Sequence, residues 1–346
     1  MGRTQERTLS PRALNRATLA RQLLLERGRL PLLPGLERVA GLQGQWNPAP
    51  FVGLWSRLEG FRREQLERAL IRRRVVKATL MRSTLHLVTA RDYPVFVAAT
   101  HGGSATTMDP RAVAVADRVT EGARALFADG PRTSADVSAW LEREHGIDAV
   151  DRWPHVWGAI RVRGSIVHAP AAALWKMPPR MSFVALQDVA APDPAEARVV
   201  LVRRYLAAFG PSTRADISKW SGLRIRDILP ALERLEPLRR FRDLDGRELY
   251  DLPRAPLPPP DRPAPVRFLP RWDNVLLGHI DQLRVAPPEY RAVGHDGTQT
   301  FLVDGMVAGS WSVGGGRVRL EPFAPLPRGA RRELEDEARR LEAFVR

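Results

Sequence analysis

Hydrophobic positions along this chain recur mostly every three or four residues, and in shorter stretches every second residue, so the pattern predicts short helices and β-hairpins. Helical spacing begins after Ser10-Pro11, an N-cap followed by the residue favoured at the first helical position. Pro48 and Pro50 prevent a later helix from continuing. The predicted helices of this N-terminal part cover residues 11–27, 34–44 and 64–74, and paired strands are predicted within 75–89.

Two stretches farther along, 130–140 and 210–220, repeat each other almost residue for residue. Gly, Pro, Thr, Ala, Asp, Ser and Trp occupy matching positions, which indicates a duplicated structural unit. In each copy a threonine is a good N-cap, and an aspartate three positions later can complete a capping box. The residues concerned are Thr133 and Asp136 in the first copy and Thr213 and Asp216 in the second.

After each copy, the pattern predicts a second helix and then a strand or hairpin. The predicted segments are 153–163 and 166–168 after the first copy, and 224–235 and 238–252 after the second. Helix, turn, helix and hairpin is the order of a winged helix-turn-helix. Residues 9–100 fit the same plan more loosely. The alternative is that the duplicated unit serves packing only.

The C-terminal part has a different character. A proline-rich stretch at 253–265 predicts an extended linker, and strands are then predicted at 266–269, 300–303, 306–313 and 317–321, before a closing helix at 328–345. We therefore expect a mostly α protein with β-hairpin wings. Its predicted parts are three tandem winged helix-turn-helix units over 9–100, 101–190 and 191–256, and a small α+β C-terminal region over 266–346.

Composition adds a partner and excludes several chemistries. Lys+Arg number 54 against 39 Asp+Glu, a net charge of +15, which points to a polyanion such as nucleic acid. With no cysteine, the chain has no disulfide, no thiolate nucleophile and no zinc-finger or iron–sulfur site. We find no secretory signal and no long apolar run, so we expect a cytoplasmic protein.

Common catalytic motifs are missing. The sequence contains no Walker A loop, no GxGxxG after a strand, no HExxH and no GxSxG. The seven histidines are scattered, and His145 and His155 lack a third ligand at metal spacing. We therefore expect neither a metal nor a cofactor.

One segment, 41–48, stands out because Gln43 and Gln45 lie on either side of a glycine. We predict Gln43 on the apolar face of the helix over 34–44, where a buried amide is costly without hydrogen-bond partners. The two side chains would then be presented together. The alternative is that both amides cap the helix end by binding its free carbonyls.

Four segments of the chain resemble the AlkZ-like DNA glycosylases, a bacterial family of winged-helix proteins. They are Gly41–Gln45, Ala78–Val88, Leu269–Leu277 and Val303–Gly309, and the similarity runs in order from about Leu9 to Val345. The resemblance implies three tandem winged helices around a basic concave surface and excision of alkylated purines, including crosslinked ones. It also implies a catalytic Gln-x-Gln motif at Gln43 and Gln45. A sister branch carries Gln-x-Asp, and some members protect antibiotic producers from their own alkylating products.

The chemistry fits so small a motif. A purine alkylated at N7 is cationic and already a good leaving group, so two neutral amides that hold a water near C1′ are sufficient. We expect a monomeric, monofunctional DNA glycosylase in base excision repair, acting on N7-alkylguanine-type lesions in duplex DNA, interstrand crosslinks or bulky natural-product adducts among them. The alternative is a non-enzymatic winged-helix transcriptional regulator.

Phosphate contacts are assigned to arginines near the predicted helices and hairpins, although each could instead be an ordinary solvated side chain. The candidates are Arg82, Arg161, Arg163, Arg224, Arg226 and Arg271. A lyase would need an amine nucleophile, and the lysines are Lys77, Lys176 and Lys219. Lys77 follows an arginine run, which favours a solvated or phosphate-facing role, so we expect excision to leave an intact abasic site.

Overall fold

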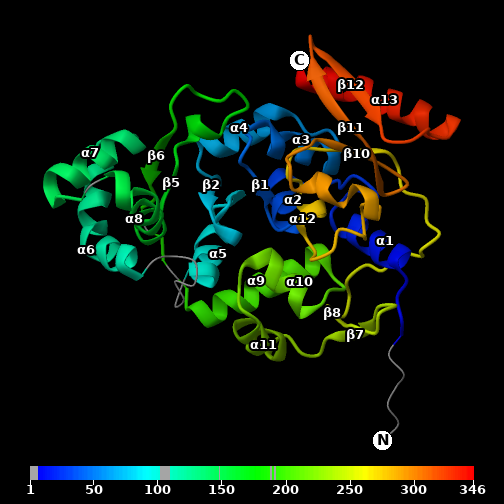
Figure 1. Ribbon diagram of the computed structural model, residues 1–346, viewed down its shortest axis with the longest axis horizontal. Helices are drawn as coiled ribbons and strands as arrows, with labels where there is room; N and C mark the ends of the chain where they lie inside the picture. The colour runs from blue at the N-terminus through cyan, green and yellow to red at the C-terminus, as the bar shows by residue number, and fades with distance from the viewer. Residues whose placement is uncertain (1–6, 102–109, 148, 188, 191) are drawn as a thin grey trace, which may run out of the picture.

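Three groups of helices with small antiparallel sheets, and a fourth region with its own sheet, make up the fold (Figure 1). The computed structural model describes residues 7–101, 110–147, 149–187, 189–190 and 192–346. The first group lies in the centre of Figure 1, the second to its left, the third below it, and the C-terminal region at the upper right. The chain thus has a mixed helical and antiparallel β architecture.

The first group contains four helices and a three-stranded sheet. Its helices are α1 (Pro11–Arg21), α2 (Leu32–Arg38), α3 (Pro48–Arg57) and α4 (Arg63–Ile71). Its strands are β1 (Leu42–Gln43), β2 (Val75–Thr79) and β3 (Leu85–Thr89), in the order β1-β3-β2, with a short 3-10 turn, η1 (Met81–Ser83), between β2 and β3. The predicted paired strands within 75–89 are confirmed. The predicted first and third helices end earlier than expected, where Leu23 and Arg73 adopt positive φ angles of 57° and 53°.

The predicted helix over 34–44 is wrong beyond Arg38. Ala40 and Gly41 adopt left-handed φ angles of 60° and 81°, which end helical hydrogen bonding. Gly41 also approaches β3 closely, because a Cβ there would lie 2.9 Å from the carbonyl oxygen of Leu87. Only glycine meets both demands at this position. A tertiary contact with a strand distant in sequence therefore overrides the helical pattern.

The second and third groups repeat the order of the first. The second has α6 (Pro110–Leu126), β4 (Arg132–Thr133), α7 (Ser134–His145), α8 (Ala149–Arg163), β5 (Ile166–His168), η2 (Pro170–Ala173) and β6 (Ser182–Ala185), and comes after α5 (Asp92–His101). The third has α9 (Pro194–Phe209), α10 (Arg214–Ser221), α11 (Ile225–Arg234), β7 (Arg239–Arg242) and β8 (Glu248–Asp251). In each group the last strand lies between the other two, with Ser212 bridging to Tyr250 as the short first strand of the third group.

The helix starts of the duplicated unit are confirmed. Thr133 and Thr213 are N-caps, and each exchanges hydrogen bonds with the aspartate three residues on. Both short helices end at a glycine in the left-handed conformation, at Gly146 and Gly222. These contacts lie within one turn of the chain, which is why the sequence alone predicts them.

The C-terminal region is a four-stranded sheet covered by one helix. Its elements are β9 (Arg267–Leu269), α12 (Asn274–Leu277), η3 (Pro288–Gly294), β10 (Thr300–Val303), β11 (Met306–Gly314), β12 (Arg317–Pro322) and α13 (Arg328–Val345). The predicted strands and the closing helix are confirmed. Apolar side chains of α13, such as Leu334 and Leu341, pack on Phe268, Phe301 and Trp311 of the sheet.

A single hydrophobic core joins the three helical groups. It contains Val76 and Ala78 from β2, Val167 from β5, and Leu201 and Ile217 from α9 and α10. One face of the first sheet therefore lies where all three groups meet. Of the helices in the described ranges, none combines the length and apolar character needed to cross a bilayer.

Candidate active site

Gln43 lies on strand β1 at the junction of the three groups. It pairs with His86 of β3, which pairs in turn with Ala78 of β2. Opposite residues in a sheet share a face, so Gln43 is on the face that carries the shared core, and its side chain is only 7% exposed. The prediction that Gln43 lies on a helix is wrong. The alternative that the two amides cap that helix is also wrong, because the helix ends at Arg38.

The amide oxygen of Gln43 accepts a hydrogen bond from Arg82. Nη2 of Arg82 donates to Oε1 of Gln43 at 3.3 Å, and Nη1 donates to the backbone carbonyl of Trp220 on α10. Burial lowers the pKa of Arg82 to about 10, so its guanidinium stays charged at neutral pH. Arg82 sits in the turn η1 with φ 54°, and its side chain joins the first group to the third.

Gln45 lies on the loop between β1 and α3. The backbone N–H of Gly44, between the two glutamines, donates to the Leu85 carbonyl at 2.8 Å and holds the loop against β3. Oε1 of Gln45 is buried, and within the described part of the chain nothing donates to it. A buried amide oxygen without a donor is costly, which makes this atom a candidate substrate-binding group.

His86, opposite Gln43 in the sheet, supplies a second buried acceptor in addition to Oε1 of Gln45. Its Nδ1 lies 3.0 Å from the Thr84 carbonyl, and a carbonyl only accepts, so the ring proton is on Nδ1. Burial, reinforced by the charge of Arg82, lowers the pKa of His86 to about 3. The imidazole is therefore neutral at physiological pH, and its Nε2 is a buried lone pair with no donor among the residues described.

Lys77 stabilises the loop from the other side of the sheet. Its Nζ donates to Oδ1 of Asn47 at 2.7 Å, and Nδ2 of Asn47 donates to the carbonyls of Ala172 and Leu174 in the second group. Lys77 is 1% exposed, and burial lowers its pKa to about 8. The predicted solvated or phosphate-facing role is therefore wrong, because β2 packs inside the molecule and its pairing with β3 sets Lys77 on a buried face of the sheet.

The C-terminal region holds the other end of the loop. Nδ2 of Asn274 donates to the Gly41 carbonyl at 2.9 Å, and the Arg271 guanidinium lies 5.2 Å from the ring centroid of Trp46. Asp273 pairs with Arg57 of α3 through two hydrogen bonds of 2.7 and 2.8 Å. Sequence reasoning gave Asn47, His86 and Asn274 no role. The segments Ala78–Val88 and Leu269–Leu277, which carry the family resemblance, contain two of them and were the available signal.

The candidate phosphate contacts are spread over the molecule. Arg82 and Arg271 lie at the Gln43–Asn47 loop. Arg161 is partly buried against the ring of Trp157, whereas Arg163 pairs with Asp117. On α11 and its N-cap, Arg224 pairs with Asp227 and Arg226 is exposed. Their contacts with DNA stay predictions.

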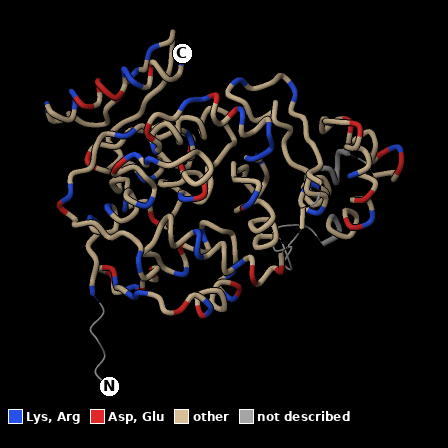
Figure 2. The backbone as a smooth tube through the Cα atoms, turned by 180° about the vertical axis from the view of Figure 1, so that it is seen from behind, with Lys and Arg blue, Asp and Glu red and all other residues tan. Residues whose placement is uncertain are grey.

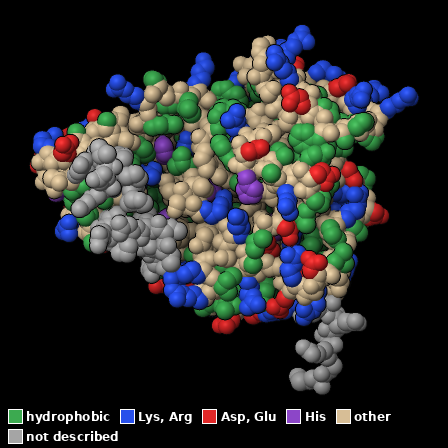
Figure 3. All heavy atoms as spheres, in the orientation of Figure 1, with side chains coloured by type: hydrophobic (Ala, Val, Ile, Leu, Met, Phe, Trp, Pro, Cys, Tyr) green, Lys and Arg blue, Asp and Glu red, His purple; other side chains and the backbone are tan. Residues whose placement is uncertain are grey.

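Charge is distributed widely over the surface. Basic and acidic residues interleave along most of the chain (Figure 2). On the face drawn in Figure 3, Lys and Arg side chains project along much of the outline. Within the described ranges, no three His, Asp or Glu side chains are grouped so that they could hold a metal ion.

Comparisons with known proteins agree with this architecture. The family model described as "DNA glycosylase AlkZ-like" matches residues 36–344. An interstrand DNA cross-link repair glycosylase from Streptomyces sahachiroi is 25% identical over 350 residues, covering 92% of this chain and 92% of that protein. The solved structure of Streptomyces sahachiroi DNA glycosylase AlkZ matches 98% of this chain and 97% of its own, with a TM-score of 0.79 and 20% identity. That structural match shows that the two chains share a fold.

Proposed function

The chain belongs to the AlkZ-like DNA glycosylase family, and on that premise we propose that it excises alkylated purines from duplex DNA. The proposed lesions are of the N7-alkylguanine type, including interstrand crosslinks and bulky natural-product adducts. Gln43 and Gln45 are the proposed catalytic residues. The observation that carries the proposal is the buried Oε1 of Gln45, which receives no hydrogen bond from any residue that the structure describes. It lies two residues from an amide already held by Arg82.

The proposed reaction is hydrolysis of the N-glycosidic bond. The bond between C1′ and the alkylated base breaks, its electron pair neutralises the cationic purine, and positive charge develops on the sugar. A water oxygen then bonds to C1′ and releases a proton to solvent. The glutamine amides orient that water without adding a charge, while the flanking phosphates stabilise the sugar cation.

The shared topology supports three tandem winged-helix units over 9–100, 101–190 and 191–256, with the C-terminal region at 266–346. In a winged helix the second helix of the helix-turn-helix enters the major groove and the hairpin lies against the backbone. The helices in that position are α4, α8 and α11. DNA contact through these helices and the candidate arginines would bring the duplex to the junction that holds Gln43.

The direct test is release of free base by the purified protein. Duplex DNA carrying N7-methylguanine and, separately, a bifunctional alkylator crosslink is incubated with the protein, and undamaged duplex serves as the control. We expect free alkylated purine from the damaged substrates and none from the control. Sequence-specific binding without base release would instead support the transcriptional regulator.

Binding to duplex DNA is expected to depend strongly on salt and weakly on sequence. Each arginine–phosphate contact releases counterions, so the logarithm of the affinity should fall with the logarithm of the salt concentration by about 0.9 per contact. The net charge of +15 motivates this expectation. Titration of a fluorescent duplex at several salt concentrations measures the slope, and a flat response would remove the electrostatic argument.

Excision is expected to leave an intact abasic site. Lys77 is buried, donates to Asn47 and lies on the opposite face of the sheet from Gln43, which does not favour attack on C1′. Lys176 and Lys219 are exposed on the second and third groups. We expect alkali-labile but uncut DNA and no covalent product after borohydride reduction. A trapped complex that disappears in Lys77→Ala would contradict a purely hydrolytic mechanism.

A further inference from the structure

Arg82 connects two acceptors that belong to different parts of the molecule. One is the side-chain oxygen of Gln43 on β1, and the other is the backbone carbonyl of Trp220, which is fully buried on α10. A guanidinium is planar and presents its donors in a fixed fork, so an arginine bound at both ends has little freedom to turn. The backbone of the turn around Arg82 also packs against the third group. A Cβ on Gly222 would lie 3.3 Å from the backbone nitrogen of Arg82.

This contact determines which way the Gln43 amide faces. Arginine has five N–H donors and no acceptor, so the Gln43 atom that meets it must be the oxygen. The terminal torsion of glutamine is otherwise soft, and an amide without such a partner presents its oxygen and its NH2 group about equally. With Oε1 held by Arg82, the NH2 group of Gln43 is the end left for another partner.

The neighbouring groups complement that orientation. Oε1 of Gln45 and Nε2 of His86 are both buried acceptors without a donor in the described part of the structure. A water molecule needs a donor for its lone pair and acceptors for its hydrogens. His86 lies opposite Gln43 across the paired strands, and Gln45 follows two residues later. An oriented Gln43 donor, together with these acceptors, would hold such a water more firmly than freely rotating amides could.

We propose that Arg82 is a positioning residue of the excision reaction: it fixes Gln43 as the hydrogen-bond donor of the site and leaves Gln45 as the acceptor. The inference rests on the proposed glycosylase function. It also changes the role predicted for Arg82, because a guanidinium already bound to Gln43 and Trp220 orients protein groups rather than a DNA phosphate.

The first experiment separates positioning from phosphate binding. Arg82→Met is expected to lower the single-turnover rate of N7-methylguanine release at saturating protein by ~10²-fold, because a catalytic group loses its alignment. DNA affinity and its salt slope should stay within error of the parent. Arg82→Lys keeps one charged donor and should recover part of the lost rate. The matched control is Arg332→Met on the exposed face of α13, which should match the parent in saturated rate, affinity and salt slope. Arg226→Met, at a candidate phosphate contact, should instead weaken binding and reduce the salt slope by about one.

The second experiment leaves Arg82 in place and compares two glutamates. Gln43→Glu should stay folded, because the carboxylate pairs with Arg82, but it cannot donate, so we expect ~10²- to 10³-fold slower release. Gln45→Glu still accepts, so we expect a loss of only about tenfold. Equal losses in the two variants, or a greater loss for Gln45→Glu, would overturn the assignment of donor and acceptor.

The remaining outcomes are also decisive. If Arg82→Met weakens DNA binding and reduces the salt slope while the saturated rate is retained, Arg82 is a phosphate contact and the inference is wrong. If the melting temperature falls while the rate per folded molecule is normal, Arg82 is only structural, and the inference is again wrong. Failure of the parent protein to release any alkylated base would instead refute the proposed function, so the two failures are distinguishable.

Discussion

Alanine at Gln43 or at Gln45 is expected to slow base release by ~10²- to 10³-fold each, the usual cost of removing one hydrogen-bonding group aimed at a transition state. Both amides are proposed to act on the water and the sugar. DNA affinity should therefore change little, because phosphate contacts come from arginines elsewhere. The double variant should be only slightly slower than the worse single variant, since groups that act on one water molecule lose their effect together.

Single-turnover release of N7-methylguanine, together with affinity for an undamaged duplex, measures this separation. Gln187→Ala is the matched control, because Gln187 is an exposed glutamine in the second group. It should match the parent in rate, affinity and melting temperature. If the Gln43 and Gln45 variants melt well below the parent yet turn over normally when folded, the two amides have a structural role and not a catalytic one.

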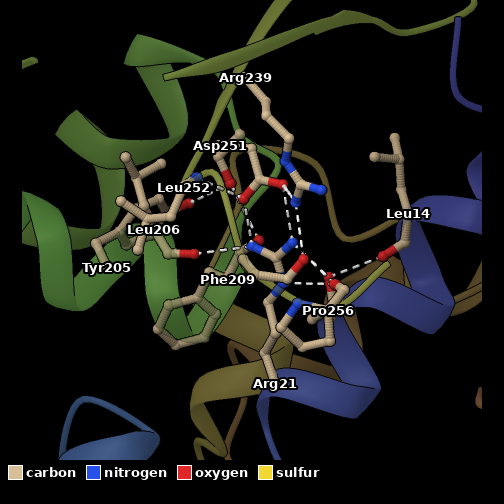
Figure 4. Close-up of polar contacts among 12 residues, drawn as sticks. Leu14, Arg21, Tyr205, Leu206, Phe209, Arg239, Asp251, Leu252 and Pro256 are labelled. Atoms are coloured by element: carbon tan, nitrogen blue, oxygen red, sulfur yellow. Dashed lines mark hydrogen bonds and ion pairs between the residues drawn. The ribbon is translucent and has the colours of Figure 1, made fainter. Parts of the chain in front are cut away.

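Alanine at Asp251 is expected to destabilise the whole protein by about 3–5 kcal/mol, the range for removing one partner of a buried ion pair. Asp251 and Arg21 are both fully buried and pair through two hydrogen bonds of 2.6 and 3.0 Å (Figure 4). Arg239 donates to the same carboxylate, and Arg21 also donates to the Leu206 and Pro256 carbonyls. The variant leaves the charged Arg21 guanidinium buried without a carboxylate partner, hydrogen-bonded to neutral carbonyls and repelled by the nearby charges of Arg239 and Arg284.

The same network joins the N-terminal helix α1 to the last strand of the third group, so its loss should loosen the junction that holds Arg82 and Gln43. Denaturant unfolding measures the change in free energy. Glu196→Ala is the control, because Nη2 of Arg234 also donates two short hydrogen bonds, of 2.6 and 2.7 Å, to this carboxylate, but the pair lies at the surface. The control should cost at most about 1 kcal/mol. Equal costs in the two variants would show that burial does not set the strength of the Asp251 pair.

Much of the fold could be predicted where the relevant contacts are local. The capping boxes at Thr133 and Thr213 bind within three residues, and the hairpin around Asp245-Gly246 closes within one turn. The strands from Thr300 onward and the helix Arg328–Val345 alternate or repeat with the period of their own structure. Such patterns depend on neighbouring residues, which the sequence displays directly.

Only part of the candidate site could be predicted from the sequence. Gln43 and Gln45 were predicted from their unusual spacing and from the family resemblance. Their surroundings were not predictable, because His86, Arg82 and Asn274 reach them through strand pairing and docking across 39 to 233 residues of sequence. The helix expected over 34–44 shows the same limit, since its apolar spacing fits a helix until β3 pairs with its end.

By itself, therefore, the sequence determined the helix starts, the hairpins, the duplicated unit, the excess of positive charge and the pair of neutral amides. Only the tertiary structure decided that Lys77 is buried behind the site, that β1 is a strand, and that Arg82 binds the oxygen of Gln43. The reason is that local hydrogen bonds and the spacing of apolar side chains depend on residues a few positions apart. Burial and the orientation of an amide depend on which distant backbone the chain brings against them.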